Sequence, residues 1–121
     1  MAARILDHPG TGERLIVHTA PEESAGALLL FEYVTGLSMP GAPDHSHADQ
    51  QERVEVLAGT LHCRVDGRER VLQTGEAIVI PPGVPHAVWN GETGESRSMG
   101  EFRPAGETLA TLEAYFGRGD A

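Results

Sequence analysis

Three histidines and one glutamate in the middle of the chain have the residue types and spacing of a metal site. His45 and His47 are two residues apart, so in an extended segment both imidazoles point to the same side. Glu52 follows shortly after them, and His86 comes after a second block of strand-forming residues. Imidazole nitrogens and a carboxylate oxygen are ligands of divalent transition metals. These four residues therefore predict a site for one metal ion.

The setting of the third histidine strengthens this interpretation. A His-x-His pair alone is more often two surface histidines than a metal site. Here an acid follows the pair, and His86 follows the proline-rich turn at residues 81–85. Proline fixes φ and Gly83 permits a tight bend, so a stiff element aims His86. The alternative is a β-barrel that uses its cavity for an organic ligand and binds no metal.

Other acids near the histidines compete with Glu52 for the role of ligand. Asp44 and Asp49 flank the pair, and Glu55 lies in the following strand. Side chains of a strand alternate between its two faces, so Glu52 shares a face with Val54 while Glu55 lies on the other face. We expect Glu55 to be solvated.

Short β-forming runs, separated by glycine and proline, predict an all-β sandwich or barrel that positions these residues. An Asp66-Gly67 pair predicts a tight hairpin. Residues 37–44 are expected to form an irregular edge that leads to His45. Leu109, Leu112 and Phe116 recur at helical spacing and predict a helix over residues 107–116 that ends at Gly117 and packs on the barrel or a partner chain. The predicted strands are residues 14–19, 27–35, 54–58, 61–65, 68–72, 77–80 and 95–103.

The two blocks around the histidines resemble the two sequence motifs of the cupin family. The first block, about residues 41–59, has the spacing of motif one except that Gly41 stands too close to His45. The second block, about residues 75–90, matches motif two in full. The matching residues are His45, His47, Glu52 and Gly59 in the first motif and Gly75, Pro81, Gly83, His86 and Asn90 in the second.

This resemblance implies a fold and a ligand set. The fold is a cupin-type β-barrel, also called a double-stranded β-helix or jelly roll, formed by residues 1–121 as a single domain with the short C-terminal helix. The implied metal ligands are His45, His47, Glu52 and His86. With no thiolate among them, they suit Mn, Fe, Ni, Cu or Zn without selecting one.

Three functions are compatible with such a site. The first is a metal-dependent oxidoreductase, similar to the cupin dioxygenases, acting on a small oxygenated organic substrate; Glu52 is its expected catalytic residue and takes the substrate's proton. The second is an isomerase of a sugar or keto acid that uses the ion as a Lewis acid. The third is a non-catalytic barrel that binds a small molecule.

Composition limits the partners. The net charge is −9, and the nine basic residues are all arginines scattered along the chain, which argues against nucleic acid or an anionic membrane. The absence of lysine excludes Schiff-base chemistry. The longest apolar run, residues 25–31, is too short to cross a bilayer, and no signal peptide is visible, so we expect a cytoplasmic protein. Small barrels with open edges often pair, so we also expect a homodimer.

Several single residues have less specific roles. We expect Cys63 to be an inert core residue and Trp89 to point away from the metal, under the C-terminal helix or in a dimer contact. Aromatic and thioether side chains are candidates for the cavity mouth, and the remaining histidines are expected at the surface. The mouth candidates are Phe31, Tyr33, Met39 and Phe102, and the surface histidines are His8, His18 and His62.

Overall fold

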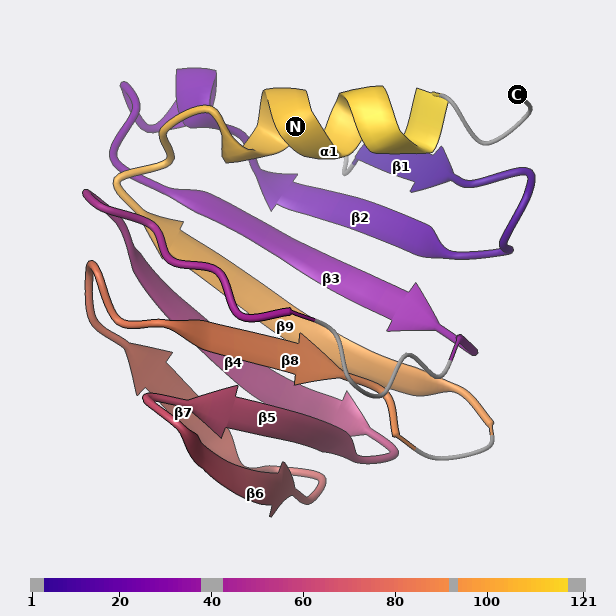
Figure 1. Cartoon of the computed structure of the whole chain (residues 1–121). Coiled ribbons are helices and arrows are strands. Elements are labelled where there is room, and N and C mark those ends of the chain that lie inside the picture. Colours follow the sequence, from indigo (N-terminus) through magenta and orange to yellow (C-terminus); the bar gives the residue numbers. More distant parts are fainter. Residues whose placement is uncertain (1–3, 38–42, 92–93, 118–121) are drawn as a thin grey trace.

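Two antiparallel β-sheets and one C-terminal helix make up the fold in the computed structural model, which describes residues 4–37, 43–91 and 94–117 (Figure 1). The larger sheet has the order β1-β2-β3-β9-β4-β7 and the smaller sheet β6-β5-β8. A short 3₁₀ helix, Pro21–Glu23, lies in the loop before β3. The elements are β1 (Arg4–Asp7), β2 (Arg14–Thr19), β3 (Leu29–Thr35), β4 (Gln51–Ala58), β5 (Leu61–Val65), β6 (Arg68–Leu72), β7 (Ala77–Ile80), β8 (His86–Trp89), β9 (Ser96–Arg103) and α1 (Thr108–Gly117).

Alternation along the strands separates a buried inner face from an outer face. In β9 the residues Ser96, Ser98, Gly100 and Phe102 point inward, while the residues between them are partly exposed. Gly100 has no side chain because the Phe31 ring of β3 lies over it, and a Cβ there would come within 2.5 Å of that ring. Phe31 itself is stacked with Phe102, with 6.1 Å between ring centroids.

Two clusters of apolar side chains form the core. One lies between the sheets and contains Cys63, which is fully buried; burial raises the pKa of its thiol. The other joins α1 to the inner face of β2, β3 and β9, with Leu109 and Phe116 as the buried residues of the helix. The predicted all-β fold with a short C-terminal helix is confirmed, and Cys63 is a core residue as predicted.

The predicted strands agree with the structure in their central residues and differ at some ends. The third strand begins at Leu29, two residues late, because Ala25 and Gly26 adopt positive φ of 54° and 84° and turn the chain first. Strand β4 begins at Gln51, earlier than predicted. The edge strand β1 was not predicted, and Gly117 is the last residue of the helix rather than the residue beyond it. The predicted irregular edge lies mostly in residues 38–42, and Met39 with it, outside the described residues.

Two turns have backbone conformations that favour glycine. Asp66 and Gly67 have φ of 51° and 80°, as a two-residue hairpin turn requires, so the predicted hairpin is confirmed. Gly59 of the first motif has φ of 76°, and a Cβ there would lie 2.8 Å from the carbonyl oxygen of Glu95. Glycine is therefore required at residue 59 for two independent reasons.

One prediction about a histidine is wrong, and one about an aromatic side chain is wrong in one of its two alternatives. The Trp89 ring does not lie under α1: it has the His62 ring at 5.9 Å and the Arg64 guanidinium at 5.4 Å, and it is not part of the cluster that packs against the helix. A dimer contact for Trp89 stays a prediction. His8 is not a surface residue: it is 8% exposed and packs against Tyr115 and Phe116 of the helix. Its Nδ1 accepts hydrogen bonds from the backbone of residues 10 and 11.

His18 is exposed as predicted, and its ring lies 2.9 Å from Glu32. None of the helices in the described part of the chain is long and apolar enough to cross a membrane.

Candidate metal centre

Backbone pairing brings the two sequence motifs together. His45 forms an isolated antiparallel bridge with His86, the first residue of β8. The bridge consists of two hydrogen bonds, 2.9 Å from the His45 N–H and 2.8 Å from the His86 N–H. The Gly83 N–H also donates to the His47 carbonyl at 2.8 Å, which fixes the proline-rich turn against the first motif. The segment before β4 and the start of β8 are therefore held side by side.

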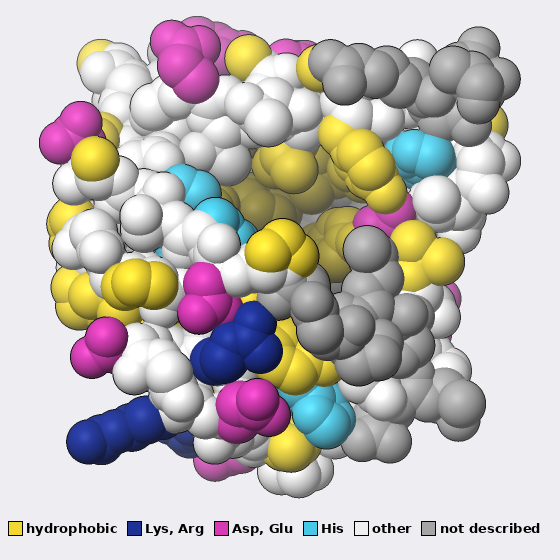
Figure 2. Space-filling view, viewed as in Figure 1, with side chains coloured by type: hydrophobic (Ala, Val, Ile, Leu, Met, Phe, Trp, Pro, Cys, Tyr) yellow, Lys and Arg dark blue, Asp and Glu magenta, His cyan; other side chains and the backbone are white. Residues whose placement is uncertain are grey.

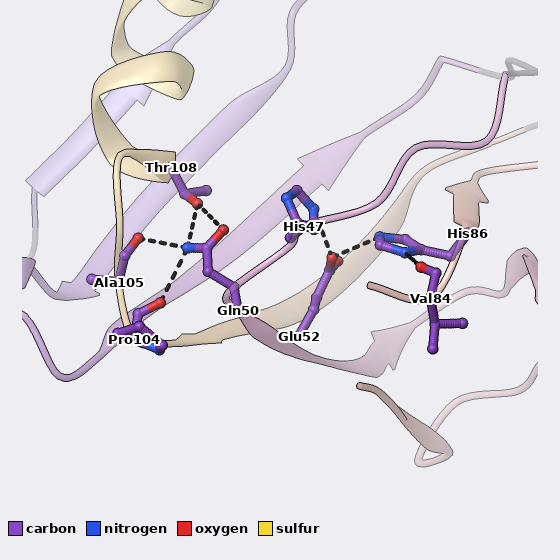
Figure 3. A network of polar contacts seen from close by, with 8 residues as sticks. All are labelled: His47, Gln50, Glu52, Val84, His86, Pro104, Ala105 and Thr108. Carbon is purple, nitrogen blue, oxygen red and sulfur yellow. Dashed lines mark hydrogen bonds and ion pairs between the residues drawn. The ribbon is translucent and has the colours of Figure 1, made fainter. Parts of the chain in front are cut away.

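The four predicted side chains converge at this place. Figure 3 shows three of them, His47, Glu52 and His86. One donor atom from each of His45, His47, Glu52 and His86 lies within 4.8 Å of the other three. Oε1 of Glu52 is 3.0 Å from Nε2 of His86 and 3.4 Å from Nε2 of His47. The rival acid Glu55 pairs instead with Arg53 on the outer face, at 3.0 Å. Glu52 is thus the acid that the fold places beside the histidines.

The orientation of His86 leaves one nitrogen for the site. Its ring is 1% exposed, and Nδ1 lies 2.9 Å from the Val84 carbonyl oxygen. A carbonyl can only accept a hydrogen bond, so Nδ1 carries a proton and donates it. Nε2 then faces Glu52 and the other two histidines with its lone pair or a second proton.

The donor set fits a divalent cation. Nε2 of His47 is buried and has no hydrogen-bond partner among the residues that the structure describes. Oε1 of Glu52 lies 3.4 Å away, but the geometry of that contact is not that of a hydrogen bond. Buried polar atoms nearly always have a partner, so such an atom calls for one. A cation between the imidazole nitrogens and the carboxylate would satisfy all of these donors at once, and nitrogen with oxygen ligands suits transition metals.

The cluster borders a cavity of about 820 Å³ that extends between the sheets toward α1. Figure 2 shows its opening as a hollow lined with hydrophobic side chains. Of the predicted mouth residues, Phe31, Tyr33 and Phe102 line the cavity. Val54, Leu61 and Val88 also line it. The site therefore faces an apolar chamber that can hold an organic molecule.

A family model describes the segment that builds this site. The model for the cupin domain matches residues 36–98, which contain both motifs and all four converging side chains. This chain belongs to the cupin family.

This cupin is similar in sequence to one characterised enzyme and in structure to several other cupins. Over 76 residues it is 32% identical to quercetin 2,3-dioxygenase of Bacillus subtilis, a match that covers 63% of this chain and 23% of that enzyme. An RmlC-like cupin from Shewanella frigidimarina has a TM-score of 0.69 at 23% identity, with 88% of each chain covered. KdgF from Halomonas sp. has a TM-score of 0.68 at 21% identity, covering 88% of this chain and 90% of that one. The likeness to these two structures shows the fold.

Several residues of the cupin's site region were not predicted from the sequence. Gln50 links the start of β4 to the start of α1: its amide nitrogen donates to the Ala105 carbonyl at 2.8 Å and contacts Thr108 Oγ1 at 2.9 Å (Figure 3). Glu13 and Tyr115 line the far part of the cavity. None of these residues belongs to a motif, and their position depends on packing between distant segments.

Electrostatics set the protonation of two of the cupin's histidines. The hydrogen bond that His86 donates to Glu52 raises the pKa of His86 against the opposing effect of burial. Burial, followed by repulsion from His86 and His47, lowers the pKa of His45. Without an ion, His86 therefore takes up a proton before His45 on acidification.

Replacement of Glu52 by glutamine should lower the pKa of His86 in the metal-free protein, because the largest cause of its elevation is removed. In the wild type, protonated His86 stabilises the folded state below its ordinary pKa of 6.5, and this contribution is lost as the pH rises through the elevated pKa. The folding stability of the variant should not show this decrease with pH. Titration of the imidazole protons by NMR measures the pKa. Glu55→Gln, which breaks an outer-face pair with Arg53, is the control and should leave the His86 pKa unchanged. Equal His86 values in wild type and Glu52→Gln would contradict the assignment of its cause.

Proposed function

We propose that this cupin is a metal-dependent oxidoreductase that acts on a small oxygenated organic substrate, and that residues 1–121 form its single domain. His45, His47, Glu52 and His86 hold one divalent transition ion in this proposal. The observation that carries it is the convergence of four donor atoms within 4.8 Å at the wall of an apolar cavity. The similarity to a dioxygenase, quercetin 2,3-dioxygenase, supports oxygen chemistry over isomerisation.

Each part of the site has a task in this reaction. A bound ion would polarise the oxygen atoms of a substrate and, if it is redox-active, exchange electrons with dioxygen. Glu52 is the catalytic residue: its carboxylate takes the proton that a substrate hydroxyl loses as the substrate binds. The Val84 carbonyl fixes the His86 ring for its role as ligand. Apolar walls exclude water, which strengthens the electrostatic interactions inside.

Removal of one imidazole should empty most of the metal site. Elemental analysis of wild-type protein, purified without added metal, should give close to one transition ion per chain. His86→Ala removes a ligand while the apolar core stays intact, so its metal content should fall at least about tenfold. His18→Ala is the control, because His18 lies on an exposed face beside Glu32. Unchanged metal content in His86→Ala would refute this residue as a ligand.

Oxygen dependence tests the reaction class. Wild-type protein loaded with iron, manganese, nickel or copper is incubated with an enol or catechol substrate under air and under nitrogen. The proposal requires products that form only under air and contain oxygen from labelled dioxygen. Identical products under both atmospheres would exclude oxygen chemistry, and equal turnover with zinc would favour the isomerase. A protein that takes up none of these metals would point to a ligand-binding barrel.

A homodimer is a further part of the proposal. Strand β1 is an outer strand of the larger sheet, and its Ile5 side chain is 53% exposed. An open edge with an exposed apolar side chain favours pairing with a second sheet edge. Sedimentation equilibrium should give twice the chain mass, and Ile5→Glu should shift the equilibrium toward monomer. A monomeric wild-type mass would refute the dimer.

A further inference from the structure

The far part of the cavity contains a buried carboxylate. Glu13 directly precedes β2, is 3% exposed and lines the same cavity as the histidines. Three hydroxyl groups donate hydrogen bonds to it. Tyr33 of β3 donates to Oε2, Tyr115 of α1 donates to Oε1, and Thr11 donates to Oε1 at 2.8 Å. Three separate segments of the chain thus converge on one carboxylate.

This carboxylate has no basic partner in the described part of the chain. The ion pairs there involve other acids. Glutamate is rarely buried without a counter-charge, because an ion loses its hydration when it enters the protein. A purely structural link between β2, β3 and α1 needs no carboxylate at this position. The cost of burying Glu13 therefore points to a role in the cavity.

The chemistry of the group is that of an acceptor. Both phenol protons are directed to Glu13, so the oxygens of Tyr33 and Tyr115 present only lone pairs to anything else. A carboxylate accepts about four hydrogen bonds, and three acceptor positions of Glu13 are taken. This end of the cavity therefore accepts a hydrogen bond and donates none. It distinguishes ligands that carry a donor from ligands that do not.

The acceptor group and the metal-site cluster lie at opposite ends of the cavity. Glu52 belongs to β4 and Glu13 adjoins β2, with β3 and β9 between them in the sheet. Three strand spacings correspond to roughly 14 Å. A ligand that reaches both ends must be elongated.

We propose that Glu13, Tyr33 and Tyr115 form a second subsite that binds a hydroxyl group at the far end of an elongated substrate whose near-end oxygens lie at the metal-site cluster. This inference rests on the proposed function for the near end. A hydroxyl matches the subsite because it brings one donor to one remaining acceptor position.

A matched set of chelating probes tests the subsite. The parent 3-hydroxyflavone carries a keto and a hydroxyl oxygen at one end; its 4′-hydroxy and 4′-aminomethyl derivatives differ only at the other end. Affinities are measured by calorimetry with the zinc-loaded protein, in which no oxidation consumes the probe. One hydrogen bond to a charged acceptor predicts that the 4′-hydroxy derivative binds about tenfold more tightly than the parent, or better.

Variants locate the source of this preference. Glu13→Gln replaces the charged acceptor by a neutral amide, so the preference for the hydroxyl should weaken, because hydrogen bonds to charged groups are the stronger ones. Tyr115→Phe removes one hydroxyl from a half-exposed residue and should reduce the preference without unfolding the chain, which circular dichroism checks. Glu55→Gln, on the outer face, should bind all probes as the wild type does.

The outcomes separate the two proposals. Zinc content per chain tests the metal site without any probe. If the protein takes up zinc but binds the parent and the 4′-hydroxy derivative equally, the subsite is refuted and the metal site stands. Tighter binding of the 4′-aminomethyl derivative than of the 4′-hydroxy derivative would overturn the hydroxyl assignment. A hydroxyl preference that survives undiminished in both Glu13→Gln and Tyr115→Phe, or a failure of all three probes to bind, would overturn the subsite itself.

Discussion

The two backbone hydrogen bonds between His45 and His86 are the constraint on which the site depends. They join segments about forty residues apart, and they do so at the two residues whose rings must meet. A side chain can be aimed accurately only when its own backbone is fixed, because each free torsion multiplies the positions that the ring can occupy. The bridge, the Gly83 contact to His47 and the Val84 carbonyl together remove this freedom. The cluster is preorganised by main-chain geometry.

The same cavity also depends on α1. A ten-residue helix is marginal alone, so its position comes from Leu109 and Phe116, which pack on the larger sheet, and from the Gln50 amide at its start. Gln50 stands two residues before Glu52, on the segment that enters β4. The helix and the cluster are therefore attached to one short piece of chain. Movement of α1 would change both the cavity volume and the backbone that supports Glu52.

Local sequence patterns predicted the strands and the hairpin, which depend on interactions between neighbouring residues. Alternation and the Asp66-Gly67 pair are properties of a few neighbouring residues, and the corresponding strands and hairpin agree with the structure. The convergence of the four site residues followed from two motifs, because their spacing reflects this folded arrangement. Trp89 and His8 show where such reasoning ends. Both were assigned from their immediate neighbours, but their surroundings come from strands and a helix that are distant in the sequence.

Glu13 is the sharpest example, since its sequence neighbours give no sign of burial. It acquires its surroundings only when β3 supplies Tyr33 and α1 supplies Tyr115. A fold of this size has few interior positions, and an apolar residue at position 13 would fill one without the cost of a buried charge. Across the cavity, His47 likewise carries a buried nitrogen that finds no hydrogen bond within the described chain. A buried nitrogen suited to a cation and a buried carboxylate with a further acceptor position face one apolar chamber, and a molecule that spans the chamber would engage both.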